Sequence, residues 1–150
     1  MKSAKSLRTK ILATINDNRS LLIRLVVGLI FLSEGIQKYL FPELLGTGRF
    51  IKIGFSHPEF LAYFTGTFEI ICGALVLFGL FTRIASIPLF IIMIIAFIAA
   101  KWPILTDKGF WSMAHEYRTD YALTLLLLYL IIYGSGKWSI DSGIIKPFKT

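Results

Sequence analysis

The stretch RLVVGLIFLSEGIQKYLF, residues 24–41, decides the fold because it is long and apolar yet carries a glutamate, Glu34. A second stretch of this kind, FEIICGALVLFGLFTR at residues 68–83, contains Glu69. Apolar runs of this length are typical of membrane-spanning helices, in which an ionised carboxylate costs roughly 3 kcal/mol. The two glutamates therefore need partners inside the protein.

The composition of the 150-residue chain also indicates a membrane protein. Hydrophobic residues make up 55% of the chain and charged residues only 17%, which leaves few polar side chains to cover a soluble domain of this size. Four apolar segments follow one another, and we expect helices over about 21–41, 60–81, 84–102 and 113–134. The sequence thus predicts an all-α fold, an integral membrane four-helix bundle.

Lysine and arginine are distributed unevenly around these segments, which predicts the orientation of the chain. Nine lie in a basic arm over residues 1–20, in the turn between the second and third segments, and in a tail over residues 136–150: Lys2, Lys5, Arg8, Lys10, Arg19, Arg83, Lys137, Lys146 and Lys149. Five lie in the two longer loops: Arg49, Lys52, Lys101, Lys108 and Arg118. We therefore expect a membrane domain over residues 21–135, with both termini in the cytoplasm.

The net charge of +7 follows from this topology. Nucleic-acid binding is not indicated, because no basic stripe interleaved with aromatic residues lies outside the apolar segments. The expected surroundings of the chain are the lipid bilayer. Arg24 and Arg83 lie near the cytoplasmic boundary, where their long side chains are expected to snorkel towards water.

Several familiar chemistries are excluded or not indicated. Cys72 is the only cysteine, so a disulfide within the chain and CxxC thiol chemistry are excluded, and a packing role is expected. His57 and His115 fall in the outer loops without metal-ligand spacing, so no metal site is predicted. No phosphate-binding loop or nucleophile elbow occurs. The sequence contains no self-sufficient catalytic motif and leaves open whether the protein is an enzyme.

Helical geometry gathers polar side chains in the outer half of the predicted bundle. At 1.5 Å per residue, Glu34 lies about 10 Å and Glu69 about 13 Å from the outer ends of their helices. Arg118 and Asp120 enter from the same side. We predict that a ligand-binding cluster forms there from Glu34, Gln37, Lys38, Glu69, Arg118 and Asp120. Within this cluster, either Lys38 or Arg118 should pair with Glu69.

Small residues predict where the helices approach one another. Gly66 and Gly73 share a stripe with Glu69 on the second helix, which lets another helix come close and turns the carboxylate towards protein. We predict packing contacts at Gly28, Gly35, Gly66 and Gly73. The polar cluster has two interpretations at this point: a network that fixes helix register, or a functional site within the membrane.

The two stretches at residues 24–41 and 68–83 resemble signatures of DoxX-like membrane proteins. The first contributes Arg24, Gly28, Phe31, Gly35 and Lys38, and the second contributes Glu69, Gly73, Leu77, Gly79, Thr82 and Arg83. The resemblance covers about residues 21–135, although many relatives have a histidine where this chain has Glu34. It implies a bacterial four-helix integral membrane protein of the inner (cytoplasmic) membrane. It also implies a relation to subunits associated with quinol or thiosulfate oxidation and to partners of redox-defence proteins. It implies no single reaction.

Two functions from different classes follow. The first is an accessory or small-ligand-binding subunit of a membrane redox system, which works with a redox partner protein and has a quinone as the candidate ligand. The alternative is a small transporter or proton-relay protein that uses Glu34 and Glu69 as protonation sites. A self-sufficient oxidoreductase is a third and weaker interpretation, because the chain has no cysteine pair and no clear cofactor ligands. The sequence does not specify the substrate, the partner or the oligomeric state.

Overall fold

Helices α2 (Arg19–Leu40) and α4 (Pro58–Phe78) form one pair in the computed structural model, which describes residues 18–144. The 22 residues of α2 rise roughly 33 Å, about the thickness of the hydrocarbon core of a bilayer. Helix α4 begins with a proline and carries Glu59 in its first turn. Both features favour a helix start, since proline fixes φ and the acid faces the positive end of the helix dipole.

Glycines bring α2 and α4 into backbone contact. A Cβ atom added at Gly28 would lie 3.0 Å from the carbonyl oxygen of Gly73, and one added at Gly35 would lie 2.7 Å from the carbonyl oxygen of Gly66. Real Cβ atoms rarely come so close, so any larger residue would force the helices apart. In each helix the two glycines are seven residues apart, about two turns, which places both contacts on the same face.

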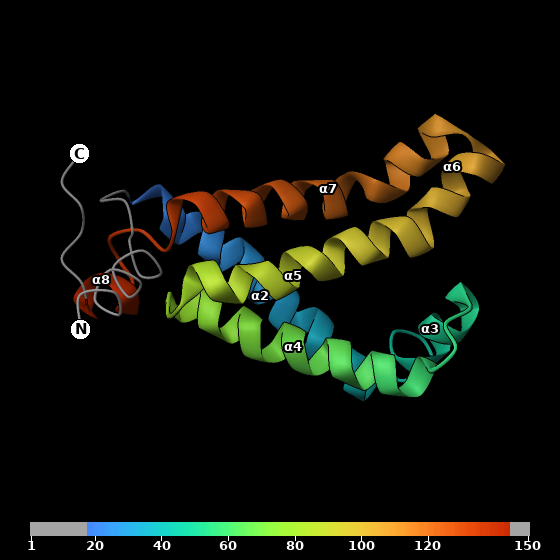
Figure 1. Ribbon diagram of the computed structural model, residues 1–150, viewed down its shortest axis with the longest axis horizontal. Coiled ribbons are helices and arrows are strands. Elements are labelled where there is room, and N and C mark those ends of the chain that lie inside the picture. The colour runs from blue at the N-terminus through green and yellow to red at the C-terminus, as the bar shows by residue number, and fades with distance from the viewer. Residues whose placement is uncertain (1–17, 145–150) are drawn as a thin grey trace, which may run out of the picture.

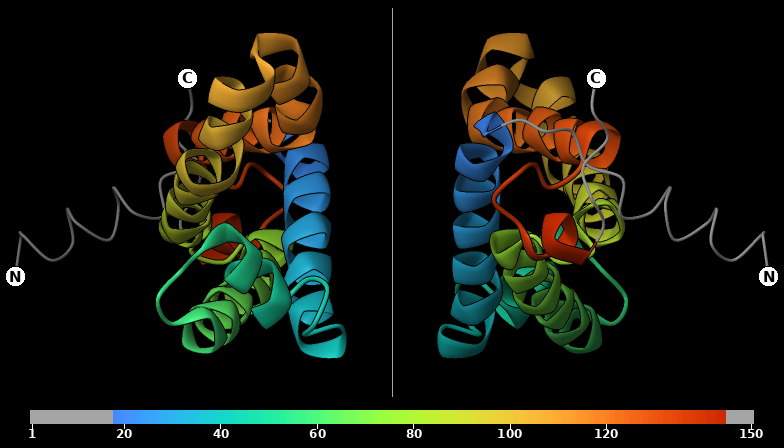
Figure 2. Two further views of the ribbon diagram at one scale, coloured as in Figure 1. Left: turned by 90° about the vertical axis from the view of Figure 1, so that its right-hand side faces the viewer. Right: turned by 90° about the vertical axis from the view of Figure 1, so that its left-hand side faces the viewer.

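Helices α5 (Thr82–Ala96) and α7 (Phe110–Tyr133) form the second pair. The connection between them starts with a π-helical turn, η1 (Phe97–Lys101), and continues with a short helix, α6 (Trp102–Lys108). Figure 1 shows α4, α5 and α7 running along the molecule, with α2 crossing obliquely behind them. In Figure 2, α2 extends from the level of α7 down to the level of α4.

The π-helical turn has a cause in the sequence. Pro103 has no N–H group to donate to the carbonyl of Ala99, and its ring crowds that carbonyl in a regular helix. The preceding amide of Trp102 instead donates to the carbonyl of Phe97, five residues earlier. The helix therefore widens for one turn before α6 begins.

Short helices cover both ends of the bundle. Helices α3 (Thr47–Ile53) and α6 lie at one end, hereafter the α3 end, and α8 (Ile140–Ile144) lies at the opposite end, hereafter the α8 end (Figure 1). The sequence interpretation treated all three segments as loops or tail and was incomplete here. Such short helices are marginal alone and form because they pack on the bundle.

Three helical stretches are long and apolar enough to cross a membrane: Arg19–Leu40, Pro58–Phe78 and Thr82–Lys108. Helix α7 is of similar length, but its first half contains Glu116, Arg118 and Asp120. The buried core joins the four long helices and consists of Val27, Phe31, Cys72, Val76, Ala85, Leu89, Met93, Leu123, Leu127 and Leu130. Most of the basic arm, residues 1–17, and the last part of the tail, residues 145–150, lie outside the described residues.

Candidate functional site

A buried ion pair joins the two helices of the first pair. Lys38 Nζ donates a hydrogen bond to Glu69 Oε2 at 2.6 Å. Only 6% of Lys38 and 4% of Glu69 is exposed, so each charge depends on the other. Glu34, one turn before Lys38 and half-exposed, places its Oε2 at 4.0 Å from the same ammonium. These three residues are called the Lys38 cluster below.

The glycines of α4 explain why this pair can form. Glu69 lies between Gly66 and Gly73, where α2 approaches most closely, and Lys38 lies in the last turn of α2. A cation in the last turn also faces the negative end of the helix dipole. Of the two candidate partners of Glu69, the structure therefore supplies Lys38.

The Lys38 cluster borders a cavity of about 210 Å³ towards the α3 end. The cavity lies between the α2–α4 pair and the α5–α7 pair, and α3 also contributes to its wall. Its charged lining residues are Glu34, Lys38, Arg49, Glu69 and Asp120, and its apolar lining includes Ile30, Phe31, Ile92, Met93, Ala96 and Leu123. It combines a mostly apolar interior with a few converging polar groups, as small-molecule sites do.

A second charged group lies behind the opposite wall of the cavity. The ammonium of Lys101, a residue only 8% exposed, lies 3.7 Å from Asp120 Oδ2 and 3.6 Å from Glu116 Oε2. It also donates to the backbone carbonyl of Glu116 at 3.2 Å. Lys101, Glu116 and Asp120 are called the Lys101 cluster below. Of these three residues, Asp120 lines the cavity.

The structure divides the six residues of the predicted ligand-binding cluster. Glu34, Lys38, Glu69 and Asp120 line one cavity. Two residues lie apart from it. Gln37 donates to Ser33 Oγ at 2.7 Å on the exposed side of α2, and Arg118 is exposed on α7.

Two cations near the cavity were missed by sequence reasoning. Arg49 was assigned to a loop, but it lies on α3, which covers this end of the bundle. Lys101 was also counted as a loop charge, and this was wrong because the π-helical turn carries it inside. The only signal in the sequence was Pro103, two residues after Lys101, which indicates an interrupted helix. It does not show which way the Lys101 side chain points.

The α8 end contains a different polar cluster, around Arg24. The expectation that Arg24 snorkels is wrong, since only 1% of it is exposed and its Nη2 donates to the carbonyl of Trp138. Within residues 18–144, Nε and Nη1 of Arg24 find no acceptor. Asp141 interacts with the guanidinium electrostatically and supplies the opposite charge. Gly79 packs directly against the guanidinium, leaving no room for a side chain.

Asp141 also fixes the tight turn between α4 and α5. Its Oδ1 accepts the amide of Phe81 at 2.8 Å, its Oδ2 accepts the amide of Thr82 at 3.2 Å, and its own amide donates to the carbonyl of Gly79 at 3.0 Å. Phe81 has a φ of 49°, an unfavourable conformation for a bulky residue. Asp141 thus caps the start of α5 from a distant segment.

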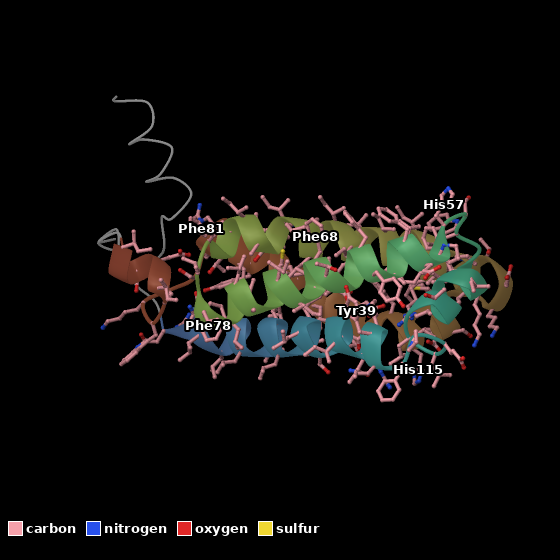
Figure 3. All side chains as sticks on the ribbon, turned by 90° about the horizontal axis from the view of Figure 1, so that it is seen from below. Tyr39, His57, Phe68, Phe78, Phe81 and His115 are labelled. Carbon is pink, nitrogen blue, oxygen red and sulfur yellow. The ribbon has the colours of Figure 1, made fainter. Side chains whose placement is uncertain are left out.

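The remaining polar candidates do not form a metal centre. His57 directly precedes α4, and His115 lies within α7 rather than in a loop; Figure 3 shows both at the α3 end. Within the described part of the chain, no group of three His, Cys, Asp or Glu side chains could hold a metal ion. Cys72 is unpaired and buried in the core.

Comparisons with known proteins place the chain in a family. The DoxX family model matches residues 20–102. An uncharacterized membrane protein of Mycobacterium tuberculosis is 48% identical over 130 residues, which cover 83% of this chain and 80% of the relative. A protein of Bacillus subtilis named "putative oxidoreductase CatD" is 34% identical over 133 residues, covering 87% of this chain and 90% of the relative. An uncharacterized protein of Haemophilus influenzae is 29% identical over 126 residues, covering 83% and 89%.

No solved structure is significantly similar. The stretches at residues 24–41 and 68–83 lie within the residues that the family model covers. The glycines that join α2 to α4 also lie within them. The chain is a membrane protein and belongs to the DoxX family.

Proposed function

We propose that this protein is an accessory membrane subunit that binds a small amphipathic ring compound for a redox system, with a quinone as the ligand. The observation that carries the proposal is the cavity at the α3 end, in which apolar residues from both helix pairs surround a few charged groups. Such a lining binds the apolar part of a ligand and orients its polar atoms.

The size of the cavity fits one ring. An apolar protein cavity of roughly 150 Å³ holds a benzene molecule, and this cavity measures about 210 Å³. One substituted ring fits, whereas a long isoprenoid chain does not. A tail would extend between the helix pairs towards the surrounding lipid.

The polar groups suit a ligand that exists as both a dione and a diol. Lys38 and Arg49 can donate hydrogen bonds to carbonyl oxygens, and Glu34 and Asp120 can accept hydrogen bonds from hydroxyl groups. The name of the Bacillus subtilis relative supports a redox role. We include a redox partner protein in the proposal, because the chain has a single cysteine and no cofactor motif of its own.

A binding measurement tests this function. Purified protein in mild detergent is titrated with decyl-benzoquinone and decyl-hydroquinone under anaerobic conditions, and bound ligand is counted by equilibrium dialysis. We expect saturable binding of one ring per chain. Met93→Trp fills the apolar part of the cavity and should abolish it, whereas the matched control Met113→Trp, buried on α7 away from the cavity lining, should not. Binding to neither compound would overturn the proposal.

A proton relay is a second candidate, supported by one arrangement. The half-exposed Glu34 lies beside Lys38, which in turn holds the buried Glu69, so three titratable groups lead inwards from the surface. On this proposal, Glu34→Gln slows proton flux in proteoliposomes at least severalfold, and Gln37→Ala, one turn away, does not. Equal flux in both variants and in empty liposomes would exclude it.

We also propose that both termini face the cytoplasm, which places the α8 end on the cytoplasmic side of the inner membrane. The excess of lysine and arginine in the arm, the α4–α5 turn and the tail supports this orientation. A fluorescent protein fused after Thr150 should fluoresce, and alkaline phosphatase fused there should be inactive. The reverse result would invert the topology.

A further inference from the structure

The cavity has two charged walls of different character. On the α2–α4 wall, the Lys38 ammonium is already hydrogen-bonded to Glu69. On the α7 wall, Asp120 turns towards the cavity while its counter-ion, Lys101, lies behind it. The first wall thus offers both the Lys38 ammonium and the half-exposed carboxylate of Glu34, whereas the second offers the carboxylate of Asp120.

Both walls act on the same space. Arg49 and Glu34 each interact electrostatically with Glu69 on one wall and with Asp120 on the other. The lining between them is apolar and includes Phe31, Met93 and Leu123, so a flat ring placed there has a polar wall at each edge.

An ionised carboxylate only accepts hydrogen bonds. A ring oxygen that faces Asp120 must therefore carry a hydrogen, as a hydroxyl does and a dione oxygen does not. At the opposite edge, the Lys38 ammonium has hydrogens beyond the one donated to Glu69, and these suit a hydroxyl or a carbonyl oxygen equally. Glu34 lies beside this ammonium, so a carbonyl oxygen at that edge still finds a donor. The discrimination between oxidised and reduced ligand thus falls on Asp120.

We infer that the cavity selects the reduced, dihydroxy form of its ring ligand, through a hydrogen bond from a ring hydroxyl to Asp120. This inference rests on the proposed function, because it concerns the same cavity. It assigns Lys101 a positioning role: the ammonium fixes the carboxylate of Asp120 at the cavity wall. The π-helical turn and the small residues Ala96, Ala99 and Ala100 make room for the ring beside that carboxylate.

The test compares three ligands on the same protein: decyl-hydroquinone, decyl-benzoquinone, and the dimethyl ether of decyl-hydroquinone, which has the same ring but no hydroxyl donor. A hydrogen bond to a charged group discriminates by about tenfold or more. We expect decyl-hydroquinone to bind at least about tenfold more tightly than the other two. Equal affinities, or tighter binding of the dione, would overturn the inference.

Two variants assign the preference to the proposed atoms. Asp120→Asn can donate as well as accept, so the preference for the hydroxyl form should fall to within about threefold while binding itself persists. Lys101→Met should weaken the preference and Lys101→Arg should restore it, which a purely structural role would not produce. Arg118→Gln, on the exposed side of α7, is the matched control and should keep the parental preference.

The outcomes separate the two proposals. If no ligand binds, the proposed function fails and the inference fails with it. If all three ligands bind equally and Asp120→Asn changes nothing, the inference fails while ring binding stands. A preference for the dihydroxy form that survives in Asp120→Asn would likewise overturn the assignment to Asp120.

Discussion

Helix α2 carries a buried cation near each of its ends, Arg24 near one and Lys38 near the other. The surroundings of the two cations differ. At the α8 end, Arg24 is enclosed by protein: Gly79 packs on its guanidinium, Trp138 supplies a carbonyl, and Asp141 supplies the opposite charge. At the α3 end, Lys38 is equally buried and more closely paired, yet it borders a cavity. The comparison indicates that a buried charge in a membrane protein is a structural feature where protein encloses it and a candidate site where it borders space.

The largest expected effect is at the enclosed end. Asp141→Ala removes the counter-ion of Arg24 and two acceptors for the amides of the α4–α5 turn, so we expect a loss of about 3 to 5 kcal/mol of stability. Thermal unfolding in mild detergent measures it. Asp107→Ala, an exposed acid on α6, is the control and should change stability by less than about 0.5 kcal/mol. If both variants unfold like the parent, Asp141 does not compensate Arg24.

Breaking the pair at the cavity should cost less. Glu69→Leu removes the hydrogen-bonded partner of Lys38, but Glu34 remains 4.0 Å from the ammonium. We therefore expect a loss of about 2 kcal/mol rather than the larger value of an enclosed pair. The double variant Glu69→Leu with Lys38→Leu should recover part of this loss. The same unfolding assay completes the cycle. Additive losses would show that the two side chains are not coupled in solution.

Two glycines with positive φ sharpen the comparison. Gly79 (φ 69°) touches Arg24 at the α8 end, whereas a Cβ at Gly54 (φ 92°), just after α3, would meet nothing within 4 Å. Each change to alanine should cost about 1 kcal/mol for the backbone conformation. Gly79→Ala should cost about 1 kcal/mol more, because it displaces the guanidinium. Equal melting temperatures for the two variants would mean that Arg24 moves aside freely.

The smallest effects are expected outside both clusters. Gln37→Ala and Arg118→Gln change residues that lie apart from the cavity, so each should alter stability by less than about 0.5 kcal/mol. Neither should change ring binding. A loss of binding in Arg118→Gln would require a second ligand contact on the exposed face of α7.

The sequence could predict the parts of this molecule that depend on composition and period. Apolar length located the three helical stretches that could cross a membrane. The glycines of α2 and α4 indicated a close contact between helices, and in the structure these two helices meet at them. The sequence limited the partner of Glu69 to Lys38 or Arg118, and the structure shows Lys38. These features depend on residues that are close in sequence or share one face of a helix. The helical period of 3.6 residues is enough to identify such residues.

The parts that could not be predicted depend on packing between distant segments. Arg24 was placed at a water boundary because nothing in its own helix shows that residues 134–144 fold over it. Arg49 was placed in a loop because a helix of seven residues makes only about two turns, too few for a hydrophobic repeat to be recognised. Arg118 and Asp120 are two residues apart and so face different sides of α7, and only one could join the cavity.

The π-helical turn at Phe97–Lys101 has a consequence for comparing members of the family. A turn of this kind accommodates one residue more than a regular turn, so every later side chain is rotated by about 100° from where an uninterrupted helix would place it. In a relative that lacks one residue here and has no proline at the position of Pro103, the helix would run unbroken and the inward direction of Lys101 would be lost. A single-residue gap at this point of an alignment therefore indicates that different side chains face the interior, and not that a loop is shorter.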